Sequence, residues 1–170
     1  MRDRWGFDLS SSDMLARVRS LVAEKPTDAD RVLLLAAALS TAGENDLAEA
    51  QARRALDLAP DHARAHTTLA TLLVTTPGNA AGDADARRDE GLRHARRAAE
   101  LDARDPSVLF NLGVAEWFAG DRSRARDALD RAGDALAGVP ADPAGGEGDG
   151  TSTATTVRHR RRWWRLGRRD

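Results

Sequence analysis

The sequence contains no cysteine, which excludes disulfide bonds, thiol catalysis and cysteine zinc sites. Aromatic residues make up only 4% of the chain, so alanine and aliphatic side chains must supply most of the core. The longest apolar run, residues 32–39, is too short to span a bilayer. Residues 1–13 carry charges and no apolar segment, so we expect no signal peptide and a cytoplasmic protein.

The length of the chain, 170 residues, suffices for one domain and a tail. Hydrophobic residues make up 41% and charged residues 31%, which is typical of a water-soluble domain. Alanine is abundant, favours helices and lets them pack closely. Because no segment alternates β-branched with polar residues, we expect an all-α protein. Lysine occurs once among 26 basic residues, and this arginine-rich, alanine-rich composition suggests a bacterial source.

Similar residues recur along the chain with a period of 34. Pro60 follows Pro26 by 34 residues, and Leu69 follows Leu35 by the same interval. Leu112 follows Leu69 by 43 residues, which indicates an insertion of nine. The turn-forming residues 75–79 place that insertion inside the second copy, between Leu73 and Gly91. The period of 34 also relates Gly91 to Ala125, Ala95 to Leu129, and Ala98 to Ala132.

The residue types at this period resemble the tetratricopeptide repeat, a helical hairpin with the pattern W-x2-L-G-x2-Y, then A-x3-F, then P. The resemblance covers residues 13–137. His66 replaces a large residue of the pattern, and Glu116 stands where tyrosine is usual. The three copies are Val32, Leu35, Ala36, Leu39, Ala48, Ala52, Ala55 and Pro60; His66, Leu69, Ala70, Leu73, Gly91, Ala95 and Ala98; and Leu109, Asn111, Leu112, Gly113, Gly120, Ala125, Leu129 and Ala132.

This resemblance implies a right-handed superhelical stack of antiparallel helix hairpins, an α-solenoid, because one hairpin cannot bury its apolar face alone. We expect turns at Gly43 and Gly120 inside two hairpins. Capping aspartates should begin several helices, with Asp105 preceding a first-turn proline. The other predicted caps are Thr27 or Asp28, Asp61 and Asp121. Seven helices are predicted near 12–24, 28–42, 45–58, 62–75, 84–101, 106–119 and 122–137, the first completing a partial leading repeat.

The chain divides into four segments by composition. Residues 1–12 form an N-terminal arm, and residues 13–137 form the repeat domain. Residues 138–156 are rich in Gly, Pro and Thr and cannot bury a core, so we expect a flexible linker. Residues 157–170 form a basic tail, which is predicted to be disordered.

In this repeat family the first helices of the hairpins line the concave face, where ligand peptides bind. The corresponding side chains here are apolar or threonine, and they offer only Arg64 and Asn111 toward a partner's terminal carboxylate. The alternative for Phe110, Trp117 and Phe118 is burial between helices. The predicted groove residues are Arg64, Thr67, Thr71, Phe110, Asn111, Val114, Trp117 and Phe118, with Leu33, Ala37, Ser40 and Val74 on the same face.

No other motif indicates chemistry. His62 and His66 have the i, i+4 spacing of a metal pair, but no third ligand is evident, and His94 is predicted to be a surface residue. The glycines of 145–150 lack the Lys-Ser/Thr of a phosphate loop. We therefore predict no enzyme activity, cofactor or metal site.

The tail is the most distinctive local feature. Residues 158–170 carry a net charge of about +6, while residues 1–157 carry about −7. Four interpretations stay open for the tail. It is a solvated segment that binds nothing, or it binds an anionic membrane surface, an acidic protein (including this one) or, least favoured, nucleic acid. The predicted contact residues are Arg160, Arg161, Arg162, Trp163, Trp164 and Arg165.

The sequence favours a protein–protein adaptor that binds a partner protein or peptide in the concave groove. The alternative is a peripheral membrane or nucleic-acid tether, in which the tail is the anchor and the repeats hold the cargo. The sequence identifies neither the partner nor the oligomeric state.

Overall fold

The computed structural model describes residues 11–76 and 83–138, and these residues form seven α-helices and no strand. The all-α prediction is confirmed, and each predicted helix end lies within one residue of the observed end. The helices are α1 (Ser11–Glu24), α2 (Ala29–Thr41), α3 (Asn45–Leu58), α4 (Ala63–Thr75), α5 (Asp83–Leu101), α6 (Pro106–Phe118) and α7 (Arg122–Leu136).

Aspartate side chains begin three of the helices. Asp28, Asp105 and Asp121 each accept a hydrogen bond from a backbone N–H group in the first turn of α2, α6 and α7, respectively. Such a cap satisfies a donor that has no partner within the helix. The predicted cap at Asp61 is wrong, because α4 begins without a side-chain cap and the Asp61 carboxylate instead accepts from Arg97 Nη2 at 2.7 Å.

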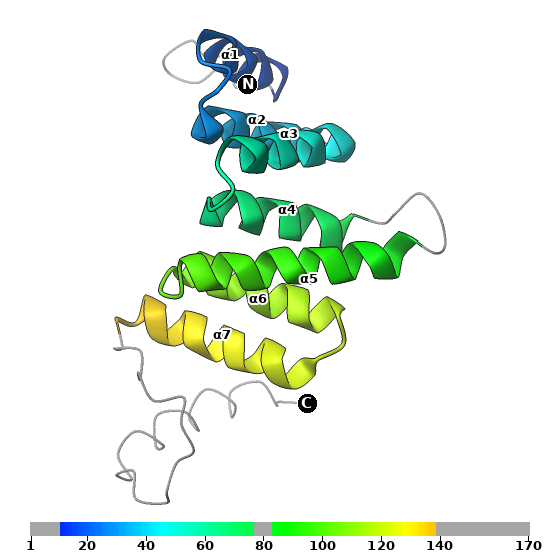
Figure 1. Cartoon of the computed structure of the whole chain (residues 1–170), viewed down its shortest axis with the longest axis vertical. Helices are drawn as coiled ribbons and strands as arrows, with labels where there is room; N and C mark the ends of the chain where they lie inside the picture. The colour runs from blue at the N-terminus through cyan, green and yellow to red at the C-terminus, as the bar shows by residue number, and fades with distance from the viewer. Residues whose placement is uncertain (1–10, 77–82, 139–170) are drawn as a thin grey trace, which may run out of the picture.

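The helices pair into three antiparallel hairpins, α2–α3, α4–α5 and α6–α7, and α1 packs on α2 as the second helix of a partial leading repeat (Figure 1). Gly43 and Gly120 form the turns within the first and third hairpins. Their φ angles are +82° and +87°, a left-handed conformation that glycine adopts without a steric penalty. The predicted turns at these two glycines are therefore confirmed.

Small residues allow the two helices of a hairpin to approach closely. A Cβ atom at Gly91 would lie 2.7 Å from Val74 Cγ1, and one at Gly113 would lie 2.7 Å from Leu129 Cγ. Neither position has room for a side chain. The core between hairpins contains the predicted large residues together with buried alanines: Val32, Leu35, Leu39, Ala52, Ala55, Leu69, Leu73, Ala95, Ala98, Leu109 and Leu112.

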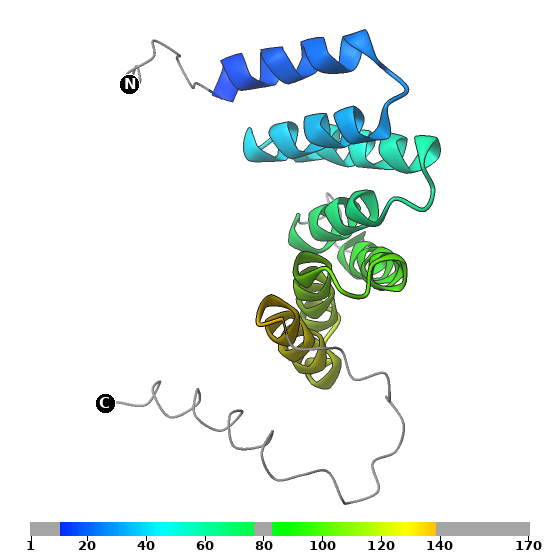
Figure 2. The same ribbon diagram turned by 90° about the vertical axis from the view of Figure 1, so that its left-hand side faces the viewer.

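The stack twists along its length. Figure 2 shows α1, α2 and α3 from the side, whereas α5, α6 and α7 are viewed closer to their axes. Helix α4 contacts both α2 and α6, so the first helices of successive hairpins lie against one another. The second helices α3 and α5 are linked mainly by long ionic side chains, such as Arg53 to Glu90 at 2.6 Å. The stack therefore curves toward the side of the first helices.

The insertion within the second copy, between α4 and α5, is partly helical. Helix α5 has 19 residues, compared with 14 in α3 and 15 in α7, and the additional residues are at its N-terminal end. From this extension, Arg87 Nη2 donates to Glu49 Oε2 of α3 at 2.8 Å. The extra turn thus ties α5 to the preceding hairpin.

The predicted segment boundaries are only partly covered by the described residues. Helix α1 begins at Ser11, inside the predicted arm 1–12, because helical geometry extends two residues beyond the first repeat position. The linker from residue 139 onward and the whole tail, including Arg160, Arg161, Arg162, Trp163, Trp164 and Arg165, lie outside the described residues.

Candidate binding site

The first helix of every hairpin leaves one face uncovered. On α4 this face carries Arg64, Thr68, Thr71 and Thr75, which are exposed or half-buried, while Leu69, Leu72 and Leu73 between them are buried. The equivalent positions of α2 and α6 are also open. We call this surface the inner strip; it consists of Asp30, Leu34, Ala37 and Thr41 on α2; Arg64, Thr68, Thr71 and Thr75 on α4; and Ser107, Asn111, Val114 and Phe118 on α6.

Threonine hydroxyls on α4 are already committed as donors. Thr68 Oγ1 donates to the carbonyl oxygen of Arg64 at 2.9 Å, and Thr75 Oγ1 donates to that of Thr71 at 2.7 Å. This bonding to the residue four positions earlier uses the hydroxyl hydrogen and leaves oxygen lone pairs and methyl groups at the surface. The strip therefore offers apolar contact and hydrogen-bond acceptors, and Arg64 is its single cationic side chain.

A side-chain contact joins the strip across two hairpins. Thr71 Oγ1 of α4 lies 3.0 Å from Asn111 Oδ1 of α6, and Asn111 Nδ2 donates to Ser107 O at 2.7 Å. The Asn111 amide is thus held in place from both ends. At the C-terminal end of α6, Phe118 borders a notch of about 190 Å³ between the end of α4 and the start of α5, lined also by Leu73, Val74, Thr75, Thr76, Ala84 and Arg88.

The structure separates the predicted groove residues into two surfaces. Arg64, Thr71, Asn111, Val114 and Phe118 lie on the inner strip, and Thr67 is half-buried at its edge. Phe110 and Trp117 are each 54% exposed, but they occupy the side of α6 that adjoins α7. The guanidinium of Arg122, at the start of α7, stacks 4.7 Å from the centroid of the Trp117 ring.

The alternative in which these aromatic residues fill the core is wrong, because Phe118 is also 45% exposed. Two further expectations for the concave face are corrected. Leu33 is 5% exposed and Val74 is 7% exposed, so both belong to the packed interior. The predicted Ala37 is exposed and Ser40 is half-buried.

Sequence reasoning missed several members of the strip, among them Leu34, Thr68 and Thr75. Leu34 is 48% exposed although it is flanked by buried leucines. The run of leucines in α2 gave no indication of which one faces solvent. The 34-residue equivalence between Leu34 and Thr68 is the signal that could have found both.

His94 is not the simple surface residue that the sequence suggested. Its Nδ1 lies 2.8 Å from His66 Nδ1, across the α4–α5 interface. His66 is 8% exposed, and its Nε2 donates to the carbonyl oxygen of Pro60 at 2.9 Å, so a neutral His66 presents a lone pair at Nδ1. His94 Nδ1 must therefore donate to His66. Burial, reinforced by the neighbouring His66, lowers the pKa of His94 from its ordinary value.

Glu116 is 3% exposed at the position where the family has tyrosine. Its two carboxylate oxygens accept from Arg96 Nε at 3.0 Å and Arg96 Nη2 at 3.2 Å. This bidentate pair connects α5 to α6 and keeps the buried carboxylate from being unpaired.

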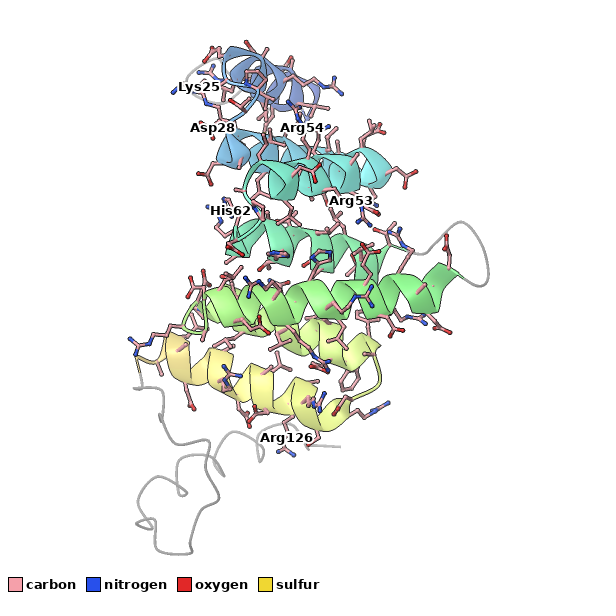
Figure 3. The ribbon with its side chains drawn as sticks, in the orientation of Figure 1. Lys25, Asp28, Arg53, Arg54, His62 and Arg126 are labelled. Carbon is pink, nitrogen blue, oxygen red and sulfur yellow. The ribbon has the colours of Figure 1, made fainter. Side chains whose placement is uncertain are left out.

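Neighbouring arginines on α3 reach in opposite directions (Figure 3). Arg54 Nη2 donates to the carbonyl oxygen of Pro26 at 2.7 Å, which anchors α3 to the loop after α1. Arg53 reaches the other way, to Glu90 of α5, and its guanidinium holds the pKa of the Glu90 carboxyl below the ordinary value. Through these contacts, charged side chains of the second helices α3 and α5 stabilise the stack.

The sequence matches no protein-family model and no curated protein sequence. Solved structures do match the fold. A tetratricopeptide-repeat protein of Thermus thermophilus, TTC0263, superposes with a TM-score of 0.66 over 72% of this chain, at 16% identity. The structure of MamA superposes with a TM-score of 0.58 over 75% of the chain, at 17% identity. The chain has the tetratricopeptide-repeat fold.

The chain spans 64% of the length of TTC0263 and 70% of that of MamA. The fold explains why Gly91 and Gly113 lie where the two helices of a hairpin approach each other closely, because tetratricopeptide-repeat hairpins require small residues where their helices meet. The sequence lacks most of the aromatic landmarks of the repeat, with His66 and Glu116 at two of them. The fold is thus kept by packing and by the paired side chains described above.

The described part of the tetratricopeptide-repeat stack comprises residues 11–76 and 83–138. None of its helices is long and apolar enough to cross a membrane. Its histidine, aspartate and glutamate side chains form no group of three or more that could hold a metal ion.

Proposed function

We propose that this protein is a non-enzymatic interaction scaffold whose inner strip binds a segment of a partner protein. The observation that carries the proposal is the continuity of the strip over the first helices of three hairpins, with Thr71 and Asn111 in contact between the second and the third. Solenoids of stacked hairpins use such concave surfaces to bind extended partners.

The chemistry of the strip defines the class of partner. Methyl groups, Leu34, Val114 and Phe118 favour an apolar segment. Threonine oxygens with free lone pairs favour partner groups that donate hydrogen bonds, such as amides. Arg64 is the strip's one cation, so a partner's terminal carboxylate has no cluster of basic side chains to bind it. The proposed partner is therefore an internal, mixed apolar and amide-rich segment.

A matched pair of leucine variants tests the proposal. Leu34 of the inner strip is 48% exposed, and Leu47 of the second helix α3 is 49% exposed. Full-length protein carrying Leu34→Arg and full-length protein carrying Leu47→Arg are used to capture partners, after circular dichroism confirms that both fold. We expect Leu34→Arg to lose a partner that the natural chain and Leu47→Arg retain. Equal capture of the partner by both variants would show that the partner does not bind on the inner strip.

A further inference from the structure

The outer face of the last hairpin holds an open apolar groove. The groove has a volume of about 570 Å³ and lies between α6 and α7, at the end of the stack opposite α1 (Figure 1). Phe110 is 54% exposed, Leu129 is 40% exposed and Leu136 is 77% exposed. The principal lining residues are Pro106, Phe110 and Asn111 of α6, and Leu129, Ala132 and Leu136 of α7.

The repeat shows that this groove is normally covered. Leu129 of α7 is 40% exposed, whereas its counterpart in α5, Ala95, is 1% exposed. In the described residues, α6 packs on α5, as α4 packs on α3. The first helix of each following hairpin therefore covers the second helix before it. Within the described part of the chain, α7 has no such cover.

The same comparison holds on α6. Phe110 corresponds to Leu33 in the first copy, and Trp117 corresponds to Val74 in the second. Leu33 and Val74 are 5% and 7% exposed, and the remaining equivalents, Thr67 for Phe110 and Ser40 for Trp117, are half-buried. The uncovered surface thus runs along both helices of the last hairpin. Two exposed aromatic side chains stand where earlier repeats place buried aliphatic or half-buried polar ones.

We propose that the basic tail of the same chain, residues 157–170, occupies this groove. Trp163 and Trp164 are the only aromatic residues after Phe118, and Leu166 follows them, so the tail holds most of the large apolar side chains available for the groove. Tryptophan buries a large area and contributes strongly to such contacts. The arginines before and after the tryptophans remain at the groove's rim.

Chain length permits this docking. Helix α7 ends at Leu136, which lines the groove, and Gly138, with a φ of +68°, follows the helix end. The segment 139–156 joins it to the tail and, as a Gly-rich chain, has a root-mean-square reach of about 23 Å. The 15-residue α7 is about 22 Å long, so the tail can reach any point of the groove. Such tethering gives an effective concentration on the order of millimolar.

Charge favours the same occupant. Residues 158–170 carry about +6, whereas residues 1–157 carry about −7. This attraction acts between exposed groups and is screened by salt, with a Debye length of about 8–10 Å at physiological ionic strength. The docking is therefore weak enough for another ligand to displace, and it depends on ionic strength.

Docking has a consequence for the inner strip, and only this consequence rests on the proposed function. Asn111 belongs to the strip and also lines the groove, and Phe110 stands next to it. A tail in the groove therefore covers one end of the strip. A partner that extends to α6 must compete with the tail, which makes the tail an intramolecular regulator of partner binding.

The absence of cysteine allows a direct test by cross-linking. Two double variants of the full-length protein carry Gly167→Cys in the tail and a second cysteine on α7, at Gly133 or at Arg131. Gly133 lines the groove and has open space around it. Arg131 is exposed on the opposite side of the same helix, at nearly the same distance from the tail's tether.

A bifunctional maleimide reagent at low salt should cross-link residues 133 and 167 about tenfold faster than residues 131 and 167. The difference should vanish at ~1 M salt, where the Debye length is about 3 Å. Adding Trp163→Ala and Trp164→Ala should also abolish it. Equal rates at both positions at low salt would overturn the proposal, and cross-links between molecules through residue 133 would assign the groove to a second copy instead.

A groove variant supplies an independent check. Leu136→Asp should lower the 133–167 cross-linking rate about tenfold, because it places a charge in the apolar groove. Leu47→Asp, at a similarly exposed leucine of α3, should leave the rate unchanged. An unchanged rate in Leu136→Asp would contradict the docking. Neither result depends on a partner, so this test is separate from that of the scaffold function.

Discussion

The guanidinium of Arg96 holds the buried carboxylate of Glu116 through two hydrogen bonds of 3.0 and 3.2 Å, and so joins the second hairpin to the third. Glu116 stands where the family has tyrosine. A carboxylate there is tolerated because α5 supplies its partner. The sequence departs from the repeat pattern at this position, and the structure compensates for the departure.

Removing Arg96 should strongly destabilise the protein. Arg96→Ala leaves a buried carboxylate without a partner and should cost roughly 2–3 kcal/mol, somewhat less than for a completely buried pair, because the Arg96 side chain is 43% exposed. Arg97→Ala, which removes only exposed pairs, should change the free energy of unfolding much less. Urea unfolding measures both. The double variant Arg96→Met, Glu116→Leu should recover most of the loss, and equal losses for the two single variants would contradict this account.

Two glycines of the last hairpin should respond to alanine in opposite ways. Gly113→Ala places a methyl group 2.7 Å from Leu129 Cγ and 3.1 Å from the carbonyl oxygen of Ala125, so it should destabilise the fold by about 1–3 kcal/mol. Gly133→Ala meets nothing within 4 Å and should stabilise α7 by about 0.5–1 kcal/mol, the helix preference of alanine over glycine. Thermal unfolding of the two variants decides the point. A stabilised Gly113→Ala variant would show that the hairpin is not packed as described.

The imidazole pair should make stability depend on pH. The pKa of His94 is lowered from 6.5 in the folded protein by burial and by His66, so the unfolded chain binds the proton more readily. The stability that His94 contributes is therefore complete above about pH 6.5 and is lost as the pH falls below that value. Glu90, Arg53 and Arg93 are the other charged groups that act on this imidazole.

His94→Asn should flatten the pH dependence of urea unfolding between about pH 7.5 and 5.5. His62→Asn is the matched control, because His62 lies across from the exposed Asp30 and outside the pair. The natural chain and His62→Asn should both lose stability on acidification over this interval. If His94→Asn loses as much as they do, the pair is not the source.

Helix positions were readily predicted from the sequence, whereas the exact surface positions were not. The 34-residue period, Gly43, Gly120 and the caps at Asp28 and Asp105 fix where helices begin and end, because these signals depend on local backbone geometry. The predicted concave face was one residue out of register at Leu33. Adjacent helix residues differ by about 100° in direction, so this small error exchanges a buried for an exposed side chain.

The paired side chains could not be predicted for a different reason. His66 with His94, and Arg96 with Glu116, join residues 28 and 20 positions apart. Their contact depends on the crossing of two helices, which no local pattern reports.

A partner bound on the inner strip should not require its terminal carboxylate. Arg64 is the strip's only cation, and the Asn111 amide is held by Ser107 and Thr71. Amidating the C-terminus of a captured peptide should therefore change its dissociation constant by less than about threefold, under about 1 kcal/mol. Isothermal titration calorimetry of the free and amidated peptides measures this. A loss of about a hundredfold would reveal a carboxylate clamp.

Site-specific photo-cross-linking in cells tests the scaffold function most directly. A photoreactive amino acid is placed at Thr71 on the inner strip or at Asp57, an exposed residue of the second helix α3, in otherwise natural full-length chains. We predict a discrete partner adduct from position 71 that is absent from position 57 and is lost when Leu34→Arg is added. Adducts of the same partner from both positions, or from position 57 alone, would contradict binding on the inner strip.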